Sequence, residues 1–305
     1  MAISFFLKVY LEIHNTTLIR IIRENPVSYS WEQCRVIAER IDQKYSEFLA
    51  GSIPITEVLS QPDDLILYIL NRNCNNCPIQ GISISINSTI PIGSGFGSSA
   101  AMISALSLVL RKITKKPFKN KKELISETRY IERLQHGKSG LIDSTTVVEG
   151  GIMFITSTTI TKHENLAGEW WAIDTGKPES STGECVAFVD KNFSNSSIWN
   201  EFNSVTNHLI ENIKKNNISK IYDYISINHS LLQSIGVVPP LISQFIRSIE
   251  KMGGSAKVSG AGSIKGTKAG LVLVGGCNPQ ELSSLYGYSC HKIKGEKNGT
   301  MLAGN

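Results

Sequence analysis

The feature that most constrains the fold is a glycine-rich loop that lies between a strand pattern and a helix pattern. Ile82, Ile84 and Ile86 alternate with serines, which predicts a half-buried strand that ends near Pro91. From Ser99 to Leu110, Ala, Met and Leu recur at spacings of three and four, which predicts a helix. The loop between them holds three glycines at alternate positions, Gly93, Gly95 and Gly97.

This loop has the composition of an anion site. Glycines let the backbone approach a ligand closely, and the free N–H groups at the start of the next helix attract negative charge. It is not a P-loop, because the Gly-Lys-Ser/Thr ending is missing, and the dinucleotide fingerprint fails because Ser98 stands where its last glycine should be. The segment therefore predicts a phosphate site of another kind. It reads Pro91-Ile92-Gly93-Ser94-Gly95-Phe96-Gly97-Ser98-Ser99-Ala100-Ala101.

Two carboxylates follow in the second informative segment. Glu132 lies on a helix predicted from Lys121 to Gln135, and Asp143 comes eleven residues later, after a glycine-containing turn. Phosphoryl transfer needs such a pair, one acid to hold a magnesium ion and one to take the proton from the attacking hydroxyl. Taken alone, two acids at this spacing also fit ordinary surface carboxylates.

A third segment is again rich in small residues. Lys257-Val258-Ser259-Gly260-Ala261-Gly262-Ser263 precedes the apolar run Ala269–Val274, which predicts a buried strand. The segment fits an ordinary turn as well as a ligand-binding loop.

Composition limits the function classes. Of the 305 residues, 41% are apolar and 19% charged, which indicates a folded chain. The net charge of +5 suits an anionic small ligand and is too weak to predict nucleic-acid binding. No apolar run is long enough to span a membrane, and the first residues make a poor signal peptide. The six cysteines are interpreted as reduced thiols, which predicts a cytoplasmic location.

The remaining patterns predict an α+β chain of two domains, with a boundary between residues 150 and 180. Strand patterns cover residues 1–24 and helical patterns run from Trp31 to about Leu70. Three β-rich or apolar runs follow Gly151, and the last part is mostly helical. Those runs are 152–160, 170–174 and 186–189, and the helices are 198–234 and 241–252. The basic cluster between residues 111 and 122 is interpreted as a solvated connector between two helices.

The three segments together, in this order and spacing, resemble the GHMP small-molecule kinases, and among them most closely the mevalonate kinases. The first loop is similar to the family's phosphate loop, with Phe96 in place of leucine. The run from Glu132 to Asp143, followed by Gly150-Gly151, resembles the family's second motif. Lys257 to Gly262 matches the third, and Asp174 to Thr182 resembles a substrate-side segment.

The resemblance implies a two-domain GHMP-kinase-like fold, with the active site in the cleft between an N-terminal α/β domain (residues 1–165) and a C-terminal ferredoxin-like α+β domain (166–305). It implies ATP-dependent phosphorylation of mevalonate to phosphomevalonate in isoprenoid biosynthesis, with ATP and Mg²⁺ as cofactors. A small-molecule substrate is the implied partner, with no nucleic acid and no membrane, and the resemblance suggests a homodimer.

The resemblance also implies residue roles. The ATP phosphates are held by the loop residues Gly93, Ser94, Gly95, Phe96, Gly97, Ser98 and Ser99. The Ser99 hydroxyl and the Glu132 carboxylate hold magnesium, and Asp143 accepts the proton from the terminal hydroxyl of mevalonate. The substrate side is formed by Thr182, Gly260, Ala261 and Gly262.

The chain departs from the family pattern at its beginning. Mevalonate kinases open with a strand whose lysine assists the catalytic aspartate. Either Lys8 to His14 is a version of that strand with one residue deleted, or Met1 to Ser4 matches the strand just after it and this sequence does not contain the motif; we favour the second alignment. In the third motif Ser263, Ile264 and Lys265 replace glycines, which predicts a stiffer or displaced loop.

Two function classes stay open. One is a kinase of mevalonate or of a close relative such as phosphomevalonate, and the other is a degenerate family member that binds a ligand without turnover. Two smaller motifs are set aside: Asp174-Thr175-Gly176 is a single aspartic-protease triplet where two are needed, and Cys74-Asn75-Asn76-Cys77 lacks the second pair of a zinc site.

Overall fold

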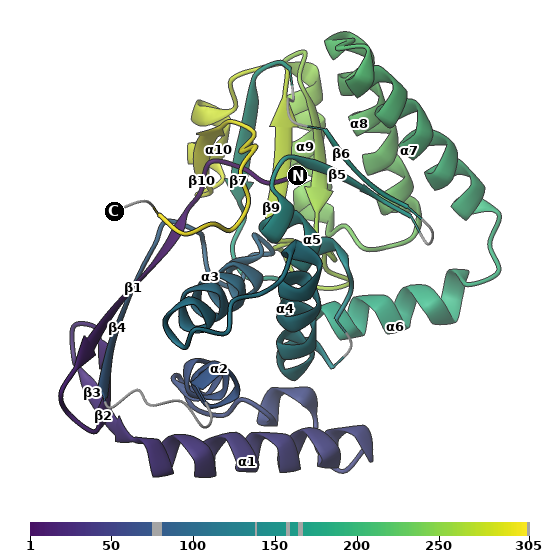
Figure 1. Cartoon of the computed structure of the whole chain (residues 1–305). Coiled ribbons are helices and arrows are strands. Elements are labelled where there is room, and N and C mark those ends of the chain that lie inside the picture. The colour runs from purple at the N-terminus through teal and green to yellow at the C-terminus, as the bar shows by residue number, and fades with distance from the viewer. Residues whose placement is uncertain (75–80, 138, 157–158, 164–166, 304–305) are drawn as a thin grey trace. The chain divides into compact units, whose positions relative to one another are not determined.

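The computed structural model describes residues 1–74, 81–137, 139–156, 159–163 and 167–303 (Figure 1). The chain folds into two compact units. Unit 1 comprises residues 1–90, 97–160 and 297–305, and unit 2 comprises residues 91–96 and 161–296. The predicted division into domains at residues 165 and 166 stays a prediction.

Unit 1 contains a mixed four-stranded sheet of β1 (Leu7–His14), β2 (Leu18–Ile22), β3 (Val27–Ser30) and β4 (Gly81–Ser88). The strand order is β1-β4-β2-β3, with β4 antiparallel to β1 and parallel to β2. The predicted strand over residues 1–24 is therefore two strands. The alternation seen in the sequence has a physical basis, because Ile82 and Ile84 are fully buried beside Ile19 and Ile21 of β2.

Helices complete unit 1: α1 (Trp31–Leu49), α2 (Asp64–Cys74), α3 (Ser98–Ile113), α4 (Lys121–His136) and α5 (Ile142–Glu149), with a short 3₁₀ turn η1 (Ile55–Glu57) and strand β5 (Ile152–Ile155). Helix α1 packs against α2, which crosses it (Figure 1). Ser30 begins α1 with a capping box to Gln33. Nearly every residue of α2 is buried, so this helix forms the centre of the unit's hydrophobic core.

The chain passes from unit 1 to unit 2 within strand β6 (Ile160–His163). Unit 2 has an antiparallel four-stranded sheet of β7 (Trp170–Asp174), β8 (Ser255–Ser259), β9 (Leu271–Gly275) and β10 (Ser289–Ile293), in the order β10-β7-β9-β8. Five helices belong to it: α6 (Thr182–Phe193), α7 (Ile198–Lys214), α8 (Ile218–Ser234), α9 (Pro240–Lys251) and α10 (Gln280–Leu285).

The core of unit 2 lies between one face of this sheet and α9. Val258, Val272 and Val274 are buried on that face, and Phe245 and Ile249 of α9 pack against them. None of the helices in the described ranges is both long and apolar enough to cross a membrane.

Two sequence predictions of local structure were wrong, and an apolar run that the sequence did not assign to a helix or a strand is helical. Residues 186–189 lie in α6, because the capping box of Ser181 and Glu184 starts a helix there and Val186 is mostly exposed. The helical pattern 198–234 is two helices, since Asn216 takes a left-handed conformation and Asn217 caps α8. The small-residue segment that begins at Lys257 starts inside the short strand β8.

The basic cluster is confirmed as a connector. Arg111 and Lys112 lie in the last turn of α3, and α4 begins at Lys121. The lysines between these helices are exposed. Cys74 ends α2, but residues 75–80 of the Cys-Asn-Asn-Cys segment lie outside the described residues.

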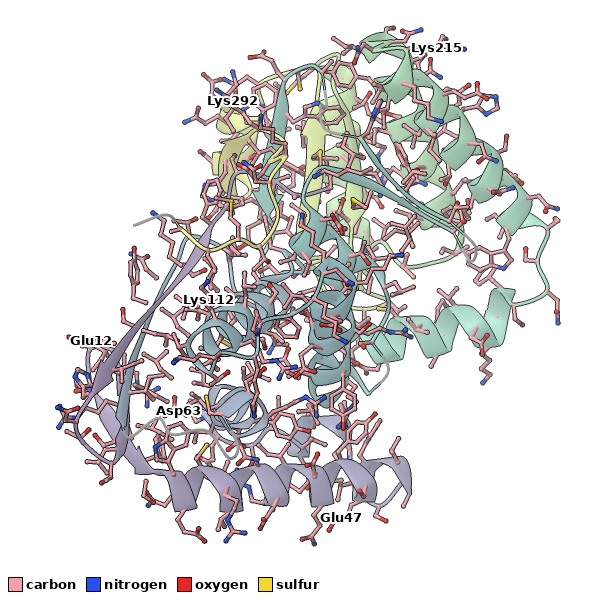
Figure 2. The ribbon with its side chains drawn as sticks, in the orientation of Figure 1. Glu12, Glu47, Asp63, Lys112, Lys215 and Lys292 are labelled. Atoms are coloured by element: carbon pink, nitrogen blue, oxygen red, sulfur yellow. The ribbon has the colours of Figure 1, made fainter. Side chains whose placement is uncertain are left out.

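A buried carboxylate anchors the first hairpin to the start of α2. Asp63, labelled in Figure 2, is 4% exposed. It accepts two hydrogen bonds from Arg23, at 2.9 and 3.1 Å, and one from the Tyr29 hydroxyl at 2.8 Å. Burial, followed by the hydrogen bond to Asp63, raises the pKa of Tyr29 to about 12.

We therefore expect Asp63→Ala to lower the free energy of unfolding by about 3 kcal/mol, because it leaves Arg23 and Tyr29 without their acceptor. Urea unfolding monitored by circular dichroism measures this change. Glu32→Ala, which breaks only the exposed pair with Arg35, is the control and should leave the midpoint within error of the wild type. Equal effects of the two variants would contradict the role given to Asp63.

Candidate active site

The start of α3 is built to leave its first backbone amides open. Gly97 is the residue before the helix and has φ +72°, a left-handed conformation that favours glycine. It provides no side-chain cap for the first turn. The free N–H groups of this turn, from Ser98 onward, therefore carry the partial positive charge of a sixteen-residue helix. This geometry supports the predicted anion site.

Helices α3 and α4 bring the predicted metal ligands together. The hydroxyl of Ser99 donates a hydrogen bond of 3.3 Å to Oε1 of Glu132. The Glu132 side chain faces the interior, because Leu124, Thr128 and Ile131 on the same helix are also buried. Only 2% of Glu132 is exposed. The serine hydroxyl is the one hydrogen-bond partner of this carboxylate within the described residues.

The pKa of Glu132 is raised to about 7, first by burial and second by the negative charge of Asp143, while the hydrogen bond from the Ser99 hydroxyl opposes both effects. When Glu132 is ionised, its buried negative charge is stabilised by only one long hydrogen bond among the described residues, so the charged form is unfavourable. A cation beside it would restore the balance, because an opposite charge favours the ionised form.

Asp143 occupies the first turn of the short helix α5, where the sequence predicted only a position after a turn. Its side chain is exposed to solvent, although surrounding protein raises its pKa by desolvation. The desolvation of Asp143 is opposed mainly by His136 at the end of α4, because the positive charge of a protonated His136 lowers the pKa of Asp143. Burial lowers the pKa of His136 in turn, which favours the neutral imidazole at neutral pH.

The donor set fits magnesium better than a transition metal. Two carboxylates and a serine hydroxyl supply only oxygen atoms, and Mg²⁺ in nucleotide sites takes one or two carboxylates and completes its shell with phosphates and water. Within the described part of the chain no three His, Cys, Asp or Glu side chains form a metal-binding cluster. Ser99 and Glu132 are therefore the residues that could hold the ion.

Unit 2 contains the other predicted site residues. Gly260 and Gly262 follow β8 and have φ +92° and +67°, so both positions favour glycine. A Cβ at Gly262 would lie 2.1 Å from the Val237 carbonyl oxygen, which leaves no room for a side chain. Ala261 lies between them. Thr182, exposed, is the first residue of α6.

Ser263 has a clear structural role, although its position was predicted only as a departure from the family pattern. It is fully buried, and its hydroxyl accepts a hydrogen bond from the Ser180 amide and donates one to the Lys265 carbonyl. The Ser180 hydroxyl accepts one from the Ile264 amide. These bonds tie the third segment to the turn before Thr182, two stretches separated by eighty residues of sequence.

The structure thus groups the predicted residues by unit. Unit 1 holds Gly97 and Ser98 together with the cluster of Ser99, Glu132 and Asp143. Unit 2 holds Gly93, Ser94, Gly95 and Phe96 with the third segment and Thr182. Within unit 2, a Cβ at Gly95 would lie 3.8 Å from the Ser259 carbonyl oxygen, so the first half of the glycine-rich loop lies beside the end of β8.

Lys8 is not positioned as a partner of Asp143. It lies on the exposed side of β1, paired across the sheet with Asn87. Its charge is not among those that shift the pKa of Asp143. The position of Lys8 in the fold therefore does not support the alignment in which Lys8 to His14 is a version of the opening motif.

Comparison with known proteins agrees with these motifs. Residues 64–151 match the family described as GHMP kinases N terminal domain. A mevalonate kinase of Archaeoglobus fulgidus is 30% identical over 186 residues, which cover 60% of this chain and 63% of the relative. A mevalonate kinase of Thermococcus sibiricus is 29% identical over 234 residues, covering 72% and 68%. The first of these alignments spans less than two thirds of the relative's length.

Solved structures show the same fold. A crystal structure of a mevalonate kinase matches with a TM-score of 0.76 at 19% identity, covering 98% of this chain and 92% of that one. The Methanococcus jannaschii mevalonate kinase matches with a TM-score of 0.74 at 18% identity, covering 97% and 90%. The predicted resemblance and the predicted α+β fold are confirmed.

The environment of Glu132 predicts a pH-dependent stability. Its pKa in the folded protein, about 7, lies above the ordinary value of 4.5, so the folded state binds the proton more tightly than the unfolded chain. Stability is therefore lost as the pH rises from about 4.5 through 7. We expect Glu132→Gln to gain about 3 kcal/mol relative to the wild type between pH 4.5 and pH 8, in the absence of metal and nucleotide.

Urea unfolding at several pH values checks this prediction. Glu39→Gln, an exposed carboxylate on α1, is the control and should show no such trend. A difference between Glu132→Gln and the wild type that stays constant with pH would show that Glu132 is not held in a poorly solvated place.

Proposed function

We propose that this chain transfers the γ-phosphate of ATP to the terminal hydroxyl of mevalonate. It contains a segment that matches the GHMP kinase N-terminal domain, and it resembles mevalonate kinases. The observation that carries the proposal is the cluster of Ser99, Glu132 and Asp143 beside the open N-terminus of α3. Phosphoryl transfer asks a protein mainly to position its reactants and neutralise charge, and this cluster provides both kinds of group.

The nucleotide binds through its phosphates. The amides around Gly97 and Ser98 at the start of α3 receive negative charge from the phosphates, because their N–H groups have no partner within the helix. The loop residues Gly93, Ser94, Gly95 and Phe96, which belong to unit 2, are also proposed to bind the phosphates. Ser99 and Glu132 hold a magnesium ion that, when bound, neutralises the charge on the phosphates.

Asp143 is the base of the proposed reaction. The hydroxyl oxygen of the acceptor attacks the γ-phosphorus, the bond from that phosphorus to the bridging oxygen breaks, and ADP leaves with the electron pair. The hydroxyl proton passes to the Asp143 carboxylate. Exposure to solvent makes the side chain accessible to an acceptor, and its raised pKa makes it a stronger base than an ordinary aspartate.

The acceptor side is proposed from unit 2. Thr182 and the Gly260-Ala261-Gly262 loop lie on two segments that Ser180 and Ser263 bind together. A Leishmania major mevalonate kinase solved with R-mevalonate has the same fold, with a TM-score of 0.69 at 16% identity. A homodimer and a cytoplasmic location remain predictions.

One observation favours a second candidate, a family member that binds its ligands without turnover. In the described residues, His136 is close enough to act on Asp143, whereas Lys8 is not. Mevalonate kinases use a lysine to assist the catalytic aspartate, so an Asp143 without such a lysine would be a weaker base in the reaction. An assay of ATP consumption with mevalonate, phosphomevalonate and homoserine separates the candidates, because turnover with none of them would favour the second.

If the proposed roles are correct, Asp143→Ala lowers kcat with mevalonate by about a hundredfold or more, because the proton acceptor is lost. ATP binding should change little, since Asp143 is not assigned to the phosphates. A coupled ADP-release assay measures the rate, and calorimetry measures the binding. Asp190→Ala, on the exposed part of α6, is the matched control and should keep wild-type turnover. Turnover by Asp143→Ala at the control's rate would contradict the assignment.

A further inference from the structure

Lys177 lies in the turn between β7 and α6, and its side chain lies along the glycine-rich loop. Its Cδ and Cγ atoms are 3.7 and 3.9 Å from the position that a Cβ at Gly93 would occupy. Gly93 has φ +77°, and both residues belong to unit 2. Lys177 is exposed. Among the described residues other than its chain neighbours, the side chain within 4 Å of this position is therefore a cation with access to solvent.

The turn that carries Lys177 is held firmly. Asp174 Oδ1 accepts a hydrogen bond of 2.8 Å from the Gly176 amide. The Thr175 hydroxyl donates to the Gly270 carbonyl at 2.8 Å and accepts from the Ala269 amide at 3.0 Å, and Thr175 is 3% exposed. The Asp-Thr-Gly triplet is thus a turn anchored on the chain before β9. Because the backbone is fixed, less entropy is lost when the lysine binds a ligand.

The glycine-rich loop is packed on the same anchor. A Cβ at Gly270 would lie 2.7 Å from the Ser94 carbonyl oxygen and 3.4 Å from Cγ of Pro178. Ser94 is 3% exposed. The absence of a side chain at Gly270 lets the loop and the turn approach each other. The relative placement of Lys177 and the loop therefore follows from contacts on both sides.

The charges in this place lack partners. Neither Lys177 nor Lys268 has a hydrogen bond or ion pair to any described residue, and Nζ of Lys268 is 3.3 Å from the position of a Cβ at Gly176. Two other lysines of unit 2 are paired, Lys220 with Asp223 at 3.0 Å and Lys265 with Glu184 at 3.1 Å. Two unpaired cations therefore flank the turn beside the loop.

The loop itself has no cation. From Pro91 to Ala101 it contains no lysine or arginine, and so it lacks the lysine with which a P-loop reaches the phosphates. Backbone amides supply hydrogen bonds to a triphosphate but only partial charge. A full positive charge from elsewhere in the chain would stabilise a polyphosphate on this loop in addition to a magnesium ion, and Lys177 is adjacent to Gly93 of the loop.

We propose that Lys177 is a phosphate-binding residue whose ammonium group binds the polyphosphate of the nucleotide on the glycine-rich loop, with Lys268 adding a second positive charge beside it. The inference rests on the proposed function in that ATP is the nucleotide. A lysine suits this role because its ammonium is a compact charge on a flexible stem that can follow the phosphates. Lys177 is then a ligand-binding residue and not part of the proton transfer.

The test compares Lys177→Gln with Lys220→Gln, a control that removes the same charge from α8. The full chain is titrated by calorimetry with Mg-ATP, with inorganic triphosphate and with adenosine. We expect Lys177→Gln to weaken the binding of ATP and of triphosphate about tenfold and to leave adenosine binding unchanged. Lys177→Arg, which keeps the charge, should recover part of the loss, and added salt should reduce the difference.

Two results would overturn the inference: Lys177→Gln binding triphosphate as tightly as Lys220→Gln, or the wild type binding no triphosphate. Equal weakening of ATP and adenosine would also overturn it, because a general disturbance of the site affects both ligands. Turnover of mevalonate is measured separately. Phosphate recognition by Lys177 without turnover would contradict the proposed function alone, whereas turnover that is insensitive to Lys177→Gln would contradict this inference alone.

Discussion

The carboxylate of Glu132 is a buried charge with little to compensate it, and the proposed active site depends on it. This side chain of α4 is buried, its one hydrogen-bond partner among the described residues is the Ser99 hydroxyl of α3, and the negative charge of Asp143 acts on it. Burial of an isolated carboxylate is unfavourable, and a protein retains one where a bound cation or a proton compensates it. The raised pKa of Glu132 and the proposed magnesium site are therefore two consequences of the same packing.

Glycine provides the second constraint, since it allows backbone segments to approach one another. Gly97 begins α3 without a cap, Gly262 lies against the Val237 carbonyl, and Gly270 lets the glycine-rich loop and the Lys177 turn pack together. A side chain at either of the last two positions would clash with backbone oxygen. In unit 2 these close contacts place the Lys177 side chain beside Gly93 of the glycine-rich loop.

Much of the site could be predicted from the sequence because its signals are local. The glycine spacing before the α3 pattern and the Glu132 pattern of α4 depend on neighbouring residues only. For residues 186–189 the sequence predicts only an apolar run, because a short run fits a strand as well as a helix, and the capping box at Ser181 starts a helix there. Asp143 was expected after a turn, but α5 is too short for its pattern to be distinct.

Long-range contacts could not be predicted in this way. Lys177 is an ordinary exposed lysine in the sequence, and its relation to Gly93 exists only because Thr175 and Ser94 both pack on the segment around Gly270. The bridge from Ser263 to Ser180 likewise joins distant segments. Neither has a periodic or compositional signal, so only the fold reveals them.

The most direct measurement of the central claim is electron paramagnetic resonance of Mn²⁺, used in place of Mg²⁺, with a non-hydrolysable ATP analogue and the full chain. If Glu132 holds the metal of the nucleotide complex, the wild type binds Mn²⁺ in the presence of the analogue, and Glu132→Gln binds it about tenfold more weakly. Equal Mn²⁺ affinities of the two proteins would contradict the claim.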